Sequence, residues 1–151
     1  MYVIFLDIDG VLRTHKSDQY WSNLLDEPIP NFYRRHFCKE AIQNLNYIIA
    51  LTGSKIVITS SWRNYYTLNE LNTIFRERGF MGSIIGCTDT LETRGDEIID
   101  WLNNHTVDKY VVIDDNIKDI VDKLPKVKVI KCNPLYGLND EVFDKVVEIL
   151  G

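Results

Sequence analysis

The fold is decided by residues 2–12, which read YVIFLDIDGVL. Residues 2–6 form a short apolar run, which is typical of a strand that is buried on both faces of a parallel sheet. Two aspartates, Asp7 and Asp9, follow at once, and Gly10 then allows the backbone to turn sharply. The stretch therefore predicts a buried strand that ends in a pair of carboxylates.

Outward from this stretch, predicted strands and helices alternate along the chain. Short apolar runs indicate the strands, and apolar residues at helical spacing indicate the helices between them. The strands are predicted over 55–59, 83–86, 110–113 and 127–130, and the helices over 38–52, 67–79, 95–103, 117–124 and the residues after Asn139. We therefore expect one α/β domain over residues 1–151, with a three-layer, Rossmann-like parallel sheet that has helices on both faces.

One segment, residues 13–37, breaks this alternation because its aromatic and proline residues have no clear period. We expect it to be a small flap, or minimal cap, that leaves the first strand and folds over the carboxyl edge of the sheet. Its candidates for contacts with nucleic-acid phosphates and bases are His15, Lys16, Arg34, Arg35, Tyr20, Trp21 and Tyr33. In the alternative interpretation, the aromatic residues only pack the flap onto the sheet.

The composition restricts the class of protein. The chain is 45% hydrophobic and 26% charged with a net charge of -5, which indicates a globular domain without a basic surface that would bind nucleic acid as a whole. Three cysteines without a CxxC pair indicate reduced thiols and a cytoplasmic protein. The sequence has no apolar run of membrane-spanning length, and its start lacks the basic region and cleavage site of a signal peptide.

Acidic residues follow two of the predicted strands. Asp7 and Asp9 end the first, and Asp114 and Asp115 follow residues 110–113. Because the carboxyl ends of parallel strands meet at one edge of a sheet, we expect these carboxylates to lie close together. Like charges so close need a countercharge, and carboxylate oxygens with water and phosphate suit Mg²⁺. Alternatively, one or more of the carboxyl groups are protonated, or the strand ends do not converge.

The spacing of Asp7 and Asp9 indicates a chemistry. In extended chain, residues two apart point the same way, so both carboxyl groups can address one substrate atom. One carboxylate can attack phosphorus and form an acyl phosphate. The other can protonate the leaving oxygen and later deprotonate the attacking water. A solvated strand end is the other interpretation of such a pair, but the buried strand before it and Gly10 after it favour the chemistry.

Residues 7–12, DIDGVL, resemble the first motif of the haloacid dehalogenase-like (HAD) superfamily, and candidates for its three other motifs follow in order. The resemblance implies a Mg²⁺-dependent phosphate monoester hydrolase that works through an aspartyl phosphate on Asp7, with Asp9 as acid and then base. The compact chain is similar to a HAD module of RNA-repair proteins, which makes nucleotides and nucleic-acid terminal phosphates the candidate substrates. The alternative is a non-catalytic phosphate-binding or scaffolding module on the same fold.

The second and third motifs imply the residues that bind the phosphoryl group. The hydroxyl of the second motif matches Ser60, with Thr59 and Ser61 one position away on either side, although Ser61 also fits a simple turn. Arg63 is a further candidate for phosphate contact. The basic residue of the third motif matches Arg94, where family members often have Lys. A surface charge at the start of a helix is the other interpretation of Arg94.

The fourth motif, an acidic pair after a buried strand, matches Asp114 and Asp115. The resemblance implies that Mg²⁺ is held by the side chain of Asp7, the backbone carbonyl of Asp9 and the side chain of Asp115. Asp114 would lie beside these ligands and hold a metal-bound water or the surroundings of the nucleophile.

Overall fold

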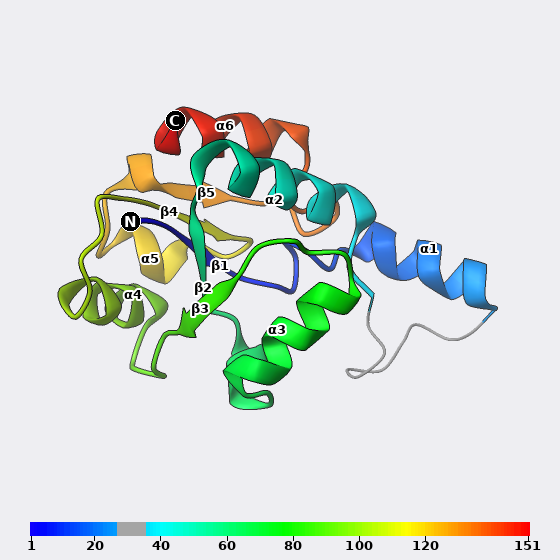
Figure 1. The fold of residues 1–151 in the computed structure, drawn as a ribbon, viewed down its shortest axis with the longest axis horizontal. Helices are drawn as coiled ribbons and strands as arrows, with labels where there is room; N and C mark the ends of the chain where they lie inside the picture. The colour runs from blue at the N-terminus through cyan, green and yellow to red at the C-terminus, as the bar shows by residue number, and fades with distance from the viewer. Residues whose placement is uncertain (27–35) are drawn as a thin grey trace.

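The computed structural model of the chain describes residues 1–26 and 36–151. Its described part contains a five-stranded parallel sheet in the order β3-β2-β1-β4-β5, so the first strand lies at the centre (Figure 1). The strands are β1 (Tyr2–Leu6), β2 (Lys55–Ile58), β3 (Ile84–Cys87), β4 (Lys109–Asp114) and β5 (Val129–Lys131). The predicted Rossmann-like α/β fold is confirmed.

Helices cover both faces of the sheet. They are α1 (His15–Leu25), α2 (Lys39–Thr52), α3 (Leu68–Glu77), α4 (Arg94–Asn103), α5 (Lys118–Val121) and α6 (Asp140–Leu150), with short 3-10 helices η2 (Ser61–Asn64) and η3 (Lys126–Lys128). Side chains of α2, α3 and α6 share one apolar core with Leu6, and side chains of α4 and α5 share a second core with Phe5. The side chains of successive residues in β1 therefore point to opposite faces of the sheet, because side chains alternate along a strand.

The register of the central strands fixes where the carboxyl edge lies. Leu6 of β1 is opposite Ile58 of β2 and Ile113 of β4. The backbone N–H of Asp7 continues the ladder by donating to the carbonyl of Ile113 at 3.1 Å. Asp7 and Asp114 are therefore neighbours across the ends of β1 and β4.

Helix α1 was not predicted, because its sequence has no apolar stripe. It begins at a reciprocal cap, in which the backbone N–H of Ser17 donates to Thr14 Oγ1 at 3.0 Å and that of Thr14 donates to Ser17 Oγ at 2.9 Å. It ends at Asp26, whose left-handed backbone has a φ of 49°. Local capping thus stabilises a mostly polar helix within the segment predicted as a flap.

The aromatic ring of Trp21 is half-buried against the chain that precedes α2. It stacks on His36 with a centroid distance of 4.6 Å, and its Nε1 donates to the carbonyl of Phe37 at 3.1 Å. These contacts join α1 to the chain before α2 and agree with a packing role for Trp21, whereas Tyr20 is 49% exposed. Residues 27–35, and with them Tyr33, Arg34 and Arg35 of the predicted flap, lie outside the described residues.

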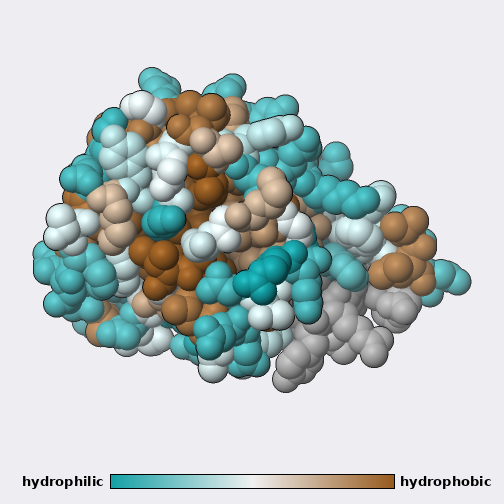
Figure 2. Space-filling view, viewed as in Figure 1, coloured by the Kyte–Doolittle hydropathy of each residue, from teal (hydrophilic) through white to brown (hydrophobic). Residues whose placement is uncertain are grey.

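The surface is of ordinary globular character. Figure 2 shows hydrophilic residues over most of one face, with apolar side chains gathered near its middle. The three cysteines are free thiols, as predicted, while the cytoplasmic location stays a prediction. Each helix in the described part of the chain is too short or too polar to cross a membrane. The candidate functional site lies at the carboxyl edge of the sheet, where β1 and β4 end.

Candidate active site

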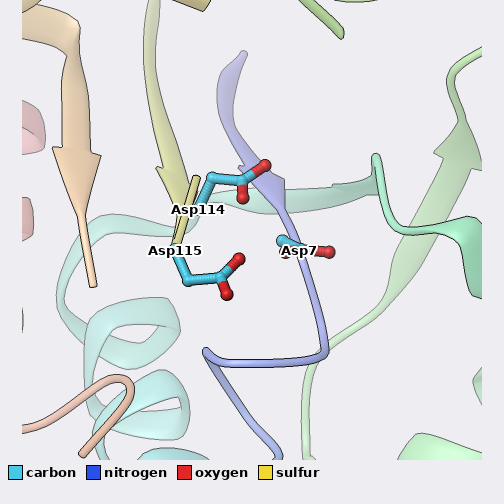
Figure 3. A group of neighbouring side chains, drawn as sticks. All are labelled: Asp7, Asp114 and Asp115. Carbon is cyan, nitrogen blue, oxygen red and sulfur yellow. The ribbon is translucent and has the colours of Figure 1, made fainter. Parts of the chain in front are cut away.

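An acidic cluster of Asp7, Asp114 and Asp115 lies at the carboxyl ends of β1 and β4. Each residue offers one carboxylate oxygen, and these atoms lie within 4.8 Å of one another. Asp7 and Asp114 are buried, and Asp115 is half-buried. Figure 3 shows the carboxyl groups of Asp114 and Asp115 directed to the side on which Asp7 lies. The predicted convergence of these two strand ends is therefore present.

The acidic cluster has three carboxyl groups, and the positive charge beside them comes from Arg94. Burial, and next the charge of Asp114, raise the pKa of Asp7 to about 9, although Arg94 acts in the opposite direction. Burial also raises the pKa of Asp115. Three neighbouring carboxyl groups cannot all ionise beside a single guanidinium, so the cluster has the charge and the oxygen donors that a further hard cation requires.

Arg94 supplies the positive charge that the structure places against the acidic cluster. Its Nη1 lies 2.7 Å from Asp114 Oδ2 and 3.5 Å from Asp7 Oδ1. Arg94 is the first residue of α4, whose N-terminus is capped by Thr93, with the backbone N–H of Asp96 donating to Oγ1 at 3.1 Å. The interpretation of Arg94 as a plain surface charge does not fit these contacts.

Gly10 gives Asp115 the space that its carboxylate occupies. A Cβ on Gly10 would lie 2.4 Å from Asp115 Oδ2, and the φ of Gly10 is +83°. A side chain at position 10 would therefore meet both a steric clash and an unfavourable backbone conformation. The absence of a side chain at Gly10 therefore lets Asp115, the residue after β4, lie against the turn that follows Asp7 and Asp9. This arrangement fits a shared Mg²⁺ site.

The side chain of Asp9 lies outside the acidic cluster. Its Oδ2 accepts a hydrogen bond from Trp62 Nε1 at 3.2 Å, and its Oδ1 accepts one from Arg13 Nη1 at 2.9 Å. The sequence motifs give no role to Trp62 or Arg13. The spacing of four residues between Asp9 and Arg13 is a weak signal for their pairing, but the contact with Trp62 depends on the tertiary fold.

The predicted phosphate-binding hydroxyls lie at the end of β2. Ser60 is buried and caps η2, with its Oγ accepting a hydrogen bond from the backbone N–H of Trp62 at 3.2 Å, which leaves its O–H able to donate. Thr59 is buried too, and its Oγ1 has no partner among the described residues. Ser61 is exposed and begins η2. The choice of Ser60 over its neighbours stays a prediction.

The side chain of Arg63 is buried and paired with a carboxylate of α4. Its side chain is 6% exposed, and its Nη2 lies 2.7 Å from Oε2 of Glu97, which is 7% exposed. Its Nη1 also donates to the carbonyl of Thr59. Arg63 therefore ties the loop after β2 to α4, and phosphate contact by Arg63 stays a prediction that these contacts do not support.

The buried pair of Arg63 and Glu97 leads to a prediction for stability. Glu97→Gln keeps the shape of the side chain but leaves the Arg63 charge without its partner, and we expect a loss of about 3–5 kcal/mol in the free energy of unfolding. Urea denaturation measures it. Glu141→Gln, in an exposed pair with Lys145, is the matched control and should change stability little. Equal, small effects of both substitutions would contradict this role of Glu97.

The fold and the acidic cluster together define a class, the Rossmann-like α/β proteins with a carboxylate site at the carboxyl edge of a parallel sheet. Residues 3–143 match the family described as the HAD domain in Swiss Army Knife RNA repair proteins. The chain belongs to this family, so it is a HAD-like module and the resemblance seen in its motifs is confirmed. Comparisons with curated proteins and with solved structures gave no match.

Proposed function

We propose that the chain is a Mg²⁺-dependent phosphate monoester hydrolase that acts through an aspartyl phosphate on Asp7. The acidic cluster, with its donor atoms within 4.8 Å of one another, is the observation that carries the proposal. The side chains of Asp7 and Asp115 and the backbone carbonyl of Asp9 would hold the ion, with Asp114 beside them. When bound, Mg²⁺ would offset the charge of the carboxylates and of the phosphoryl oxygens.

In the first step, a carboxylate oxygen of Asp7 attacks phosphorus in line with the leaving oxygen. A bond forms between Asp7 and phosphorus, the bond from phosphorus to the leaving oxygen breaks, and Asp9 donates a proton to that oxygen. Arg94 and Ser60 hold the phosphoryl oxygens as their charge changes. In the second step, Asp9 takes a proton from a water molecule that attacks the aspartyl phosphate. Inorganic phosphate leaves, and Asp7 is regenerated.

The contacts of Arg94 support its role as the cation for phosphate in place of the usual Lys. Its guanidinium already lies beside both Asp7 and Asp114, and its side chain is 27% exposed, which leaves room for contact with a substrate. Gly95 lets the start of α4 pack closely against α5, because a Cβ there would lie 2.6 Å from the carbonyl oxygen of Asp119. A planar guanidinium can bind two phosphoryl oxygens at once.

We propose terminal phosphates of nucleotides or nucleic acids as the substrates. The description of the family as a domain of RNA repair proteins supports this class. A pocket of about 180 Å³ beside the acidic cluster is lined by the acidic residues Asp9, Asp18 and Asp115 together with Arg13 and His15. Arg13 pairs with Asp9 and Asp18 in this pocket, so Mg²⁺ and Arg94 would supply most of the positive charge for an anionic substrate, and the position of Asp9 in the lining supports its role as the acid.

Phosphate release measured on a panel of substrates tests the proposal. The panel contains an aryl phosphate, mononucleotides, and oligoribonucleotides with a 3′ or a 5′ phosphate, each with Mg²⁺ and with excess EDTA. We expect turnover that requires Mg²⁺, returns when the ion is restored, and is faster on an oligoribonucleotide end than on the aryl phosphate. Binding of phosphorylated oligonucleotides without any turnover would contradict the proposal and favour the non-catalytic module.

A further inference from the structure

We infer that Trp62 is a positioning residue which, together with Arg13, fixes the carboxyl group of Asp9 for proton transfer to the leaving oxygen. The inference rests on the proposed function and adds to it a residue that the four motifs do not contain. Trp62 would act through Asp9 and would not touch the substrate.

The carboxyl group of Asp9 needs support because it lies at the mouth of the site. Its side chain is 40% exposed, which is far more than that of Asp7, at 9%. An exposed carboxyl group samples several rotamers, and proton transfer requires it within hydrogen-bond reach of the leaving oxygen. Contacts to both of its oxygens restrict these rotamers.

Trp62 provides a rigid donor for the first of these contacts. It is 1% exposed, and its ring packs against Phe37 and Tyr66, each with a centroid distance of 5.8 Å. The indole N–H can only donate, and it donates to Asp9 Oδ2 at 3.2 Å. A side chain that is fixed on its other sides by the core can hold the orientation of Asp9 without adding charge.

Arg13 provides the second contact from a different element. Its Nη1 donates to Asp9 Oδ1 at 2.9 Å, while its Nη2 lies 2.7 Å from Oδ2 of Asp18 on α1. Its backbone carbonyl also accepts the N–H of Gly10 at 2.7 Å, which closes the turn after β1. The two oxygens of Asp9 are thus held from two directions, one from η2 and one from the turn before α1.

Trp62→Phe removes the N–H while keeping an aromatic ring in the core. The matched control is Trp101→Phe, because Trp101 is also a buried tryptophan but packs edge-on against Phe5 in the second core, with a centroid distance of 5.6 Å. Both substitutions replace a buried indole by a phenyl ring. A loss of activity that occurs in Trp62→Phe but not in Trp101→Phe is therefore attributed to the contact with Asp9.

The experiment compares kcat/KM for two phosphate monoesters that differ in their leaving group. This constant reports the steps up to departure of the leaving group, where Asp9 acts as acid. 2,4-Dinitrophenolate leaves without a proton, whereas an alkoxide needs one. We expect Trp62→Phe to lower kcat/KM for an alkyl phosphate by about tenfold to a hundredfold and to change it little for 2,4-dinitrophenyl phosphate. Asp9→Asn should show the same selectivity with a larger loss.

A second measurement keeps the inference testable if Trp62→Phe folds poorly. The chain has three tryptophans, so ¹⁵N NMR of the wild type should give three indole N–H signals, which Trp21→Phe and Trp101→Phe assign by elimination. In Asp9→Asn, the Trp62 signal should shift most. An unmoved Trp62 signal, or a loss in Trp62→Phe that is equal for both substrates, would overturn the inference alone. Absence of turnover in the wild type would overturn the proposed function together with it.

Discussion

Asp7→Asn should abolish phosphate release while the protein stays folded. The amide that replaces the carboxylate is not a nucleophile towards phosphorus, so the aspartyl phosphate cannot form and turnover should fall by several orders of magnitude. Phosphate release on the best substrate of the panel measures this loss, with circular dichroism as the check of folding. Activity near that of the wild type would mean that Asp7 is not the nucleophile.

The same variant should be more stable than the wild type when metal is removed. Burial and Asp114 raise the pKa of Asp7 to about 9 in the folded protein, above its ordinary value of 3.8. The folded state therefore binds a proton that the unfolded state has lost, and this contribution to stability declines as the pH rises from about 4 to about 9. An amide at position 7 does not titrate, so the advantage of Asp7→Asn should increase over this range.

Thermal denaturation in EDTA at several values between pH 5 and pH 9 measures the effect. Asp144→Asn is the matched control, because Asp144 is exposed on α6, on the opposite layer from Arg94. It should change neither turnover nor the dependence of the melting temperature on pH. A melting temperature of Asp7→Asn below that of the wild type at pH 9 in EDTA would contradict the crowding of charge in the acidic cluster.

The sequence predicts the sheet well because its strands are buried on both faces. Such strands appear as short, continuous apolar runs, and the first of them, Tyr2–Leu6, has the predicted bounds. Alternation of strands and helices favours a parallel sheet, whose strands all end at one edge, and the order in which β4 lies beside β1 then makes Asp7 and Asp114 neighbours. The sequence therefore predicts the gathering of Asp7, Asp114 and Asp115, but not that the side chain of Asp9, expected to join them, pairs with Trp62 and Arg13 instead.

Other features depend on interactions that a periodic pattern does not show. Helix α1 is stabilised by its capping residues and not by an apolar stripe. The ion pair of Arg63 with Glu97 depends on the packing of α4 against the loop after β2, which no local pattern in the sequence shows. The contact of Trp62 with Asp9 joins residues 53 apart in the chain. These contacts follow from the fold, so they cannot be read before it is known.

Gly10→Ala should disable the metal site with the smallest possible change in side chain. The new methyl group would meet Asp115 Oδ2 at 2.4 Å in a backbone with a φ of +83°, so either the turn after β1 or the carboxylate of Asp115 must move. Bound Mg²⁺ at a hundred times its Kd should stabilise the wild type by about 2.7 kcal/mol, which corresponds to a rise of roughly 5–10 °C in Tm. In Gly10→Ala we expect this rise to disappear and turnover to fall by about a hundredfold or more.

Gly53→Ala is the matched control, because it puts a side chain on a left-handed backbone without a clash like that between position 10 and Asp115. Gly53 ends α2 with a φ of +66°, but a Cβ there would have no atom within 4 Å. Both variants should therefore lose about 1–2 kcal/mol through backbone strain. Only Gly10→Ala should also lose the rise in Tm with Mg²⁺, since only Gly10 faces Asp115. If Gly10→Ala kept that rise and its turnover, Asp115 would not be the ligand that reaches Mg²⁺ across the turn after β1.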